Sequence, residues 1–198
     1  MAEPAVRRAT WADLEALPEG VRGELIGGVL YAQAQPRPRH QRAVTTLAGR
    51  IGGPYDHGPG GPGGWWILVE PGIGLPSLDV EEMAPDLAGW RRERLPELPD
   101  GQIQLAPDWV CEVPSPTTRA HDLKRKRPLY ARAGVRWMWI VDLEARTVTA
   151  SRLHDPASPE ESRWLELGVW ADDDEICAEP FEHVTLRCAD LWGSPQAR

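Results

Sequence analysis

The segment from Val135 to Val141 constrains the fold of this chain more than any other. It is an almost uninterrupted apolar run and includes Trp137 and Trp139. A run of this kind is typical of a strand that lies in the centre of a sheet and is buried on both faces. Such a strand needs cover on both sides, so the chain is expected to build a sheet with helices packed on its faces.

Other parts of the chain predict the elements around this strand. Apolar residues at helical spacing and capping residues predict helices over 10–17, 40–51 and 120–133, with Gly134 ending the last one. Alternating or apolar segments predict a hairpin over 24–32 and strands over 65–70, 79–82, 85–90, 107–113, 147–153 and 163–170. Residues 36–39 are expected to form a linker, 52–64 a mobile loop and 186–192 a short helix. The expected fold class is therefore α/β, a central mixed β-sheet flanked by helices, in a single domain over 1–198.

Length and composition limit the possible functions. The chain has 198 residues, enough for one domain with a real core, and no apolar stretch approaches the roughly 18 residues of a membrane span. Its three cysteines have no C-x-x-C spacing, so we expect a protein of the reducing cytoplasm. The net charge of −8 is unlike that of proteins that coat DNA non-specifically. It is compatible with an enzyme that contacts nucleic acid through one site.

Positive charge is concentrated in one segment despite the acidic total. Six cations fall between positions 119 and 132: Arg119, Lys124, Arg125, Lys126, Arg127 and Arg132. The cluster is either a surface for phosphate groups or an ordinary solvated helix face. His121 lies in the same segment and is a weaker candidate for contact with phosphate.

Three acidic residues lie next to predicted strands: Glu24, Asp86 and Glu112. Glu112 is the most informative, because the strand around it is otherwise suited to burial. A buried carboxylate must be paired, hydrogen-bonded or bound to a metal, unless the alternation of the strand turns it toward solvent. Carboxylates on neighbouring strands form an oxygen site suited to Mg²⁺ or Mn²⁺.

The predicted helix over 120–133 carries a second group of polar residues. Asp122, Lys126 and Tyr130 are spaced i, i+4 and i+8, so they share one face if the helix is continuous. A lysine beside two carboxylates could stabilise charge on a phosphate under attack or position a water molecule. Alternatively, Asp122 and Lys126 form a surface ion pair of little consequence. Pro128 either kinks the helix or delays the start of its regular part.

These residues belong to a series of motifs that appear in a familiar order. The motifs are Gly23-Glu-Leu-Ile-Gly-Gly28, His40, Ala84-Pro-Asp-Leu87, Glu112-Val-Pro-Ser-Pro-Thr-Thr118, His121-Asp-Leu-Lys-Arg-Lys126, Tyr130-Ala-Arg-Ala-Gly-Val135 and Trp137-Met-Trp-Ile-Val-Asp142. Together they closely resemble the Uma2 family, which belongs to the PD-(D/E)XK nuclease-like superfamily. The resemblance extends from about Thr10 to Trp192 and implies a restriction endonuclease-like core with acidic residues gathered at one end.

The resemblance also implies roles for individual residues. Asp86 and Glu112 match the two acids of the superfamily motif and would hold the metal. The usual lysine position, two residues after Glu112, is Pro114 here, and Lys126 in the helix matches the Uma2 pattern instead. Glu24 matches the acid that the N-terminal segment often supplies.

Three further residues match the family pattern as supporting residues. Asp122 and Tyr130 accompany Lys126 on the predicted helix, and His40 matches a family position with no assigned role.

The main functional hypothesis is a metal-dependent endonuclease that hydrolyses DNA with Mg²⁺ or Mn²⁺ held by Asp86 and Glu112. Nucleic acid would approach over Arg119, Arg125 and Arg127, and a homodimer would bring together the two sites needed to cut both strands. The alternative is a catalytically inactive nucleic-acid- or protein-binding module on the same fold. A purely structural role would leave Glu112 and Lys126 unexplained.

Overall fold

The computed structural model describes residues 7–33, 35–58, 60–154 and 163–193. Its largest element is a six-stranded sheet in the order β10-β9-β8-β7-β6-β3, in which only the β7–β8 pair is parallel. The strands of this sheet are β3 (Trp65–Val69), β6 (Leu87–Arg91), β7 (Trp109–Glu112), β8 (Trp137–Asp142), β9 (Thr147–His154) and β10 (Arg163–Ala171).

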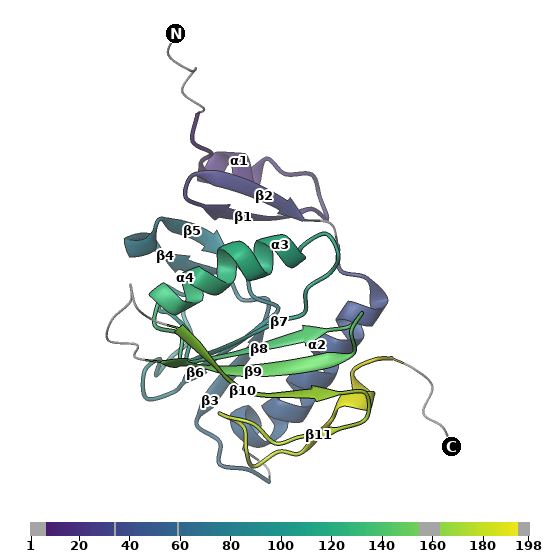
Figure 1. The fold of residues 1–198 in the computed structure, drawn as a ribbon. Coiled ribbons are helices and arrows are strands. Elements are labelled where there is room, and N and C mark those ends of the chain that lie inside the picture. Colours follow the sequence, from purple (N-terminus) through teal and green to yellow (C-terminus); the bar gives the residue numbers. More distant parts are fainter. Residues whose placement is uncertain (1–6, 34, 59, 155–162, 194–198) are drawn as a thin grey trace.

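Two smaller sheets and short helices complete the fold (Figure 1). A four-stranded sheet in the order β2-β1-β5-β4 consists of β1 (Arg22–Ile26), β2 (Val29–Gln33), β4 (Ile73–Leu75) and β5 (Val80–Met83). A two-stranded sheet pairs β11 (Glu175–Ile176) with β12 (Leu186–Arg187). The helical elements are α1 (Trp11–Glu15), α2 (Pro38–Gly52), η1 (Gly53–His57), η2 (Pro76–Leu78), α3 (Arg119–His121), η3 (Asp122–Lys126), α4 (Arg127–Arg132) and η4 (Cys188–Asp190).

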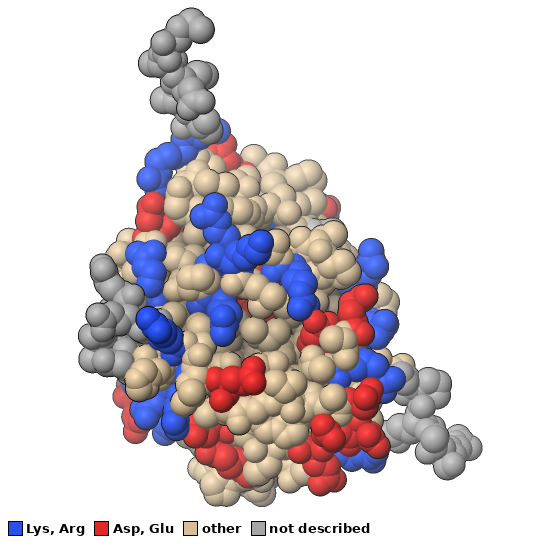
Figure 2. Space-filling view, viewed as in Figure 1, with Lys and Arg blue, Asp and Glu red and all other residues tan. Residues whose placement is uncertain are grey.

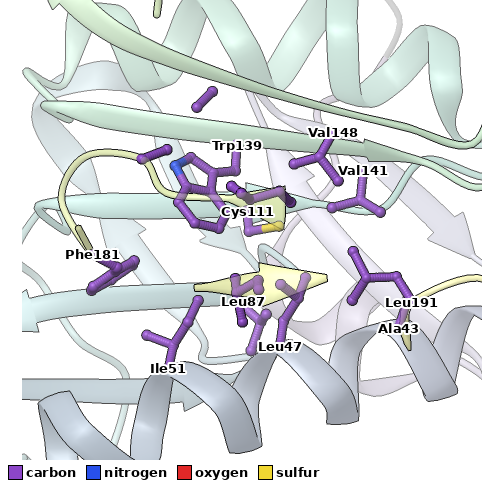
Figure 3. Packing of buried hydrophobic residues seen from close by; sticks show 14 of the residues in the cluster. Ala43, Leu47, Ile51, Leu87, Cys111, Trp139, Val141, Val148, Phe181 and Leu191 are labelled. Atoms are coloured by element: carbon purple, nitrogen blue, oxygen red, sulfur yellow. The ribbon is translucent and has the colours of Figure 1, made fainter. Parts of the chain in front are cut away.

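One face of the six-stranded sheet is covered by α2. Leu47 and Ile51 of this helix are fully buried and belong to one core cluster with Leu87, Cys111 and Trp139 of the sheet. Figure 3 shows these side chains in the layer between the helix and the strands. Because successive strand residues point to opposite faces, this packing fixes which residues reach the other face.

The opposite face is covered by α4 and by the four-stranded sheet. Val110 and Met138 of the large sheet form a second core cluster with Leu129 and Tyr130 of α4. Strand alternation therefore turns Glu112, two residues after Val110, toward α4. Parallel strands need a crossover, and the α3–η3–α4 segment provides it between β7 and β8.

The mixed α/β architecture and most predicted elements are confirmed. The central strand is β8, and the hairpin turns at Gly27 and Gly28, which both have positive φ angles (62° and 71°) as a primed turn requires. None of the helices in the described ranges has both the length and the hydropathy of a membrane-spanning segment.

Several details of the sequence prediction are wrong. The expected linker over 36–39 is partly helical, since α2 begins at Pro38, and proline is suited to the first turn of a helix. The expected loop over 52–64 contains the π-helical turn η1 with Tyr55 buried in it. Strand β4 was not predicted. In place of the expected C-terminal helix, the chain forms the short strand β12 followed by one turn of 3₁₀ helix, η4.

Candidate active site

Glu112 lies at the end of β7, with its side chain under α4. All four residues of β7 are buried, so the alternation of the strand does not turn Glu112 toward solvent. One Glu112 carboxylate oxygen, Oε1, accepts hydrogen bonds from Tyr130 Oη at 2.5 Å and from Lys126 Nζ at 2.9 Å. Burial and the nearby Asp122 and Asp86 raise the pKa of Glu112 well above its usual value, against the attraction of Lys126.

Lys126 is the centre of this cluster, and its side chain is only 2% exposed. Its Nζ lies 2.9 Å from Glu112, 3.0 Å from Glu24 Oε1 and 3.8 Å from Asp122 Oδ1, and it donates to the backbone carbonyl of Ala84 at 2.9 Å. Burial opposes its charge, but the attraction of Glu112, Glu24 and Asp122 outweighs burial and raises the pKa of Lys126. The lysine therefore carries a positive charge that these carboxylates compensate.

The backbone around Pro128 determines how Lys126 is presented. Pro128 has no amide hydrogen to donate to the carbonyl of Lys124, and its ring crowds that carbonyl. The preceding turn, η3, is π-helical, with the amide of Arg127 donating to the carbonyl of Asp122, and α4 begins at Arg127. The predicted helix thus runs from Arg119 to Arg132 but contains a π-helical turn before Pro128, and Asp122, Lys126 and Tyr130 still converge. Because Asp122 and Lys126 are both buried, the surface ion pair is excluded.

Glu24 reaches the cluster from β1, in the four-stranded sheet. Its Oε1 accepts from the backbone amide of Ala84 at 2.9 Å, and its Oε2 lies 2.5 Å from His121 Nε2 and 3.3 Å from Gln33 Nε2. Burial raises the pKa of Glu24, but the attraction of Lys126 and the bonds from His121 and Ala84 lower it to about 2. Glu24 is therefore an ionised group that joins the hairpin to the crossover segment.

Asp86 lies just before β6, next to the end of β7. Its Oδ2 accepts a hydrogen bond from the backbone amide of Val113 at 2.7 Å, and its Oδ1 lies 2.9 Å from His40 Nε2. Burial lowers the pKa of His40, but the hydrogen bond and charge of Asp86 reverse this and raise it. His40 thus gains a structural partner that the sequence did not assign to it.

The structure brings the predicted acid and lysine positions to one end of the two neighbouring strands. Within the described residues, no group of three or more His, Cys, Asp and Glu side chains is arranged to hold a metal ion. A site with two carboxylates fits Mg²⁺, which usually keeps several waters and binds one or two carboxylates together with substrate phosphates. The oxygen donors of Asp86 and Glu112 are hard ligands of this type.

The three predicted nucleic-acid contacts lie in different surroundings. Arg119 forms an ion pair with Asp142 at the end of β8. Arg127 is half-buried under Trp164, whose ring nitrogen donates to the Arg127 carbonyl, and burial lowers its pKa. Arg125 is exposed and lies beside a groove.

The sequence did not predict the role of His121. It was considered a possible phosphate contact, but its Nε2 bonds to Glu24 and its ring lies 4.3 Å from that of Tyr31, centroid to centroid. The Glu24–His121 pair joins residues 97 positions apart, so no local pattern could reveal it. The only signal was that His121 directly precedes Asp122 in a polar motif.

Comparisons with known proteins identify the family and the fold of the chain. A family model described as "Uma2: Putative restriction endonuclease" matches residues 11–185. The crystal structure of a "putative nuclease belonging to DUF820" from Anabaena variabilis ATCC 29413 is similar, with a TM-score of 0.67 and 20% sequence identity. The similarity covers 92% of this chain and 97% of that one, and at this identity it establishes the fold alone. No curated protein matches the chain.

Proposed function

Since this chain belongs to the Uma2 family, we propose that it is a metal-dependent nuclease that hydrolyses phosphodiester bonds of DNA. The observation that carries the proposal is the position of Lys126. Its Nζ is buried within 3.0 Å of both Glu24 and Glu112, close to the strand ends where Asp86 lies. A buried lysine between carboxylates is costly in free energy. Charged groups in such surroundings are concentrated at functional sites, so this geometry favours a chemical role.

Asp86 and Glu112 would hold Mg²⁺ or Mn²⁺ in this proposal. A bound cation of this kind polarises a phosphoryl oxygen and lowers the pKa of a water molecule. Tyr130 and His40 fix the orientation of the two carboxylates through their bonds to Glu112 and Asp86. Such partners of ligand residues keep a site in its reactive geometry.

Lys126 supplies positive charge where negative charge develops on the phosphate under attack. Groups placed in this way, before the reaction and away from water, stabilise the transition state more than the bound substrate. Glu24 and Asp122 hold the ammonium group in position, and His121 holds Glu24.

The proposal is tested by incubating supercoiled plasmid with the protein in Mg²⁺, in Mn²⁺ and in EDTA. Cleavage in either metal but not in EDTA is expected. Calorimetry with Mn²⁺ tests the ligands: Asp86→Ala and Glu112→Ala should each lose affinity, whereas Asp173→Ala, an exposed acid in the turn after β10, should not. Unchanged Mn²⁺ affinity in both site variants would refute the metal site.

One observation favours the alternative of an inactive binding module. Lys126 forms ion pairs with both Glu112 and Glu24, so both carboxylates already have a cationic partner without a metal ion. The two functions differ in one measurement: an inactive module binds nucleic acid but leaves the plasmid intact in both metals.

We further propose that the nuclease acts as a homodimer. A single site cuts one strand at a time, and cleavage of both strands in one event needs two sites. Symmetric dimers are the commonest assembly by which a chain provides them.

A further inference from the structure

A groove of about 420 Å³ lies between the β1–β2 hairpin and the η3–α4 segment, outside the carboxylate–lysine cluster. One side presents the cations Lys124, Arg125 and Arg132, all exposed. The groove is within the size range of pockets that hold small organic groups. It uses none of the residues that compensate Lys126.

The charge of the groove is strongly positive. None of Lys124, Arg125 and Arg132 forms an ion pair within the part of the chain that the structure describes. Asp79 is the one acidic residue lining the groove, and Arg8 Nη2 lies 2.6 Å from both of its carboxylate oxygens. Among the described residues, three cations of the groove thus have no acidic partner, in a protein whose net charge is −8. Figure 2 shows Lys and Arg side chains over the η3–α4 segment, with Asp and Glu more frequent toward the bottom of that face.

The other lining residues of the groove are apolar or aromatic. Ile26, Val29 and Tyr31 come from the hairpin and Leu129 from α4. Val29 is 48% exposed, so its side chain is open to a ligand in the groove. Phosphates alone would be bound by cations without such a surface, whereas unpaired bases rest on apolar and aromatic side chains.

The groove adjoins the candidate active site through one pair of rings. Tyr31 lines the groove, its ring is 4.3 Å from that of His121, and His121 Nε2 is 2.5 Å from Glu24. Ile26 in the groove and Glu24 in the cluster are two residues apart on β1, so their side chains share one face of the strand. A chain bound in the groove would therefore end beside Glu24, at the edge of the cluster.

We propose that this groove binds a single-stranded segment of nucleic acid and leads it into the active site. Lys124, Arg125 and Arg132 contact its phosphates, and a base lies against Val29 and Tyr31. The inference rests on the proposed nuclease function for the destination of the strand. Binding in the groove is nevertheless measurable without cleavage.

The test measures fluorescence anisotropy of a labelled single-stranded oligonucleotide and of its blunt duplex, in EDTA, over a series of salt concentrations. Lys124→Glu and Arg132→Glu should each weaken binding of the single strand by at least about tenfold at low salt. Each removed phosphate contact should also flatten the salt slope by about 0.7. The matched control is Arg187→Glu, an exposed cation on β12, which should bind as the wild type does.

A second pair of variants separates folding from binding and tests the apolar surface. The double variant Lys124→Gln/Arg132→Gln removes two positive charges and adds no negative charge. Like the glutamate variants, it should bind the single strand more weakly than the wild type does, and its melting temperature should be unchanged. Val29→Ser should lower affinity for the single strand without changing the salt slope. Wild-type affinity in the charge variants, or a wild-type preference for the blunt duplex, would overturn the proposal.

The outcome is distinguishable from that of the nuclease proposal. Metal-dependent cleavage with normal binding by the groove variants would refute the groove and keep the nuclease. Groove-dependent binding of the single strand without cleavage in either metal would support the groove and refute the nuclease.

Discussion

Lys126 is the residue on which both the stability of the cluster and its proposed chemistry depend. Its ammonium group compensates Glu24 and Glu112 in a nearly dry environment. Removing one partner of a buried ion pair leaves an uncompensated charge, which is strongly destabilising. We therefore expect Lys126 to stabilise the fold in addition to its proposed role in catalysis.

We predict that Lys126→Met loses both cleavage and stability. Loss of a preorganised charge should reduce the cleavage rate about 10²–10³-fold. Loss of charge compensation should cost about 3–5 kcal/mol of unfolding free energy at neutral pH. Plasmid cleavage and urea unfolding measure the two effects. Arg187→Met is the control, because Arg187 is an exposed cation on β12, outside both the cluster and the groove. It should keep wild-type stability and wild-type turnover.

Glu24 gives the fold a defined dependence on acid. Its pKa is about 2 in the folded protein, compared with 4.5 for an unperturbed glutamate. A depressed carboxyl pKa contributes stability that is fully present above 4.5 and is lost as the pH falls toward 2. We predict that Glu24→Gln lacks this component. The difference in unfolding free energy between wild type and variant should shrink by roughly 3 kcal/mol between pH 6 and pH 2. Urea unfolding at a series of pH values measures it, and a difference independent of pH would contradict the assignment.

At the scale of elements, the β1–β2 turn places both the cluster and the groove. Gly27 has a φ of 62°, and residues other than glycine and asparagine adopt this conformation at a cost of about 1–2 kcal/mol. We predict that Gly27→Val loses about this much unfolding free energy, whereas Gly27→Asn stays close to wild type. Urea unfolding ranks the variants. Gly101→Val is a control in an open position without positive φ, and equal losses at the two positions would refute the argument.

Some elements are determined by their local sequence, and others depend on contacts with distant parts of the chain. The hairpin, α2 and β8 follow from turn glycines, helical spacing and an apolar run, so the sequence predicts them. Strand β4 is too short to carry a pattern and exists through its pairing with β5. The π-helical turn η3 follows from Pro128, but the sequence left open whether a kink or a delayed start would result. In the structure a π-helical turn precedes Pro128, and the regular α-helix α4 begins at Arg127.

The same division applies to the candidate site. The motifs predicted Glu24, Asp86, Glu112 and Lys126 as members, and the structure brings these residues together. The contacts of His121 with Glu24 and of His40 with Asp86 join residues from separate elements. They depend on how the hairpin and α2 pack against the large sheet. A single sequence without its fold contains no distance from which they could be inferred.

At the scale of the whole molecule, charge is distributed unevenly. The total of −8 would repel a nucleic acid at long range, and salt would screen that repulsion. Lys124, Arg125 and Arg132 lie together on the η3–α4 side, near the proposed entry to the site. Local potential rather than total charge determines where a polyanion binds. This distribution favours one approach direction toward each copy of the protein.

The proposed homodimer makes a prediction about the products of cleavage. If two sites in one assembly cut both strands, wild-type protein should convert supercoiled plasmid to linear DNA with little open-circular intermediate. Glu112→Gln removes one carboxylate ligand while keeping the size of the buried side chain, and Tyr130 can still donate to its amide oxygen. A dimer with one wild-type and one Glu112→Gln chain has one working site and should only nick the plasmid. Wild-type protein unfolded and refolded with excess Glu112→Gln should therefore accumulate open-circular DNA, which gel electrophoresis resolves. If each copy acts independently, the variant only dilutes the wild type. Cleavage then slows while the ratio of linear to open-circular product stays the same, and the dimer proposal fails.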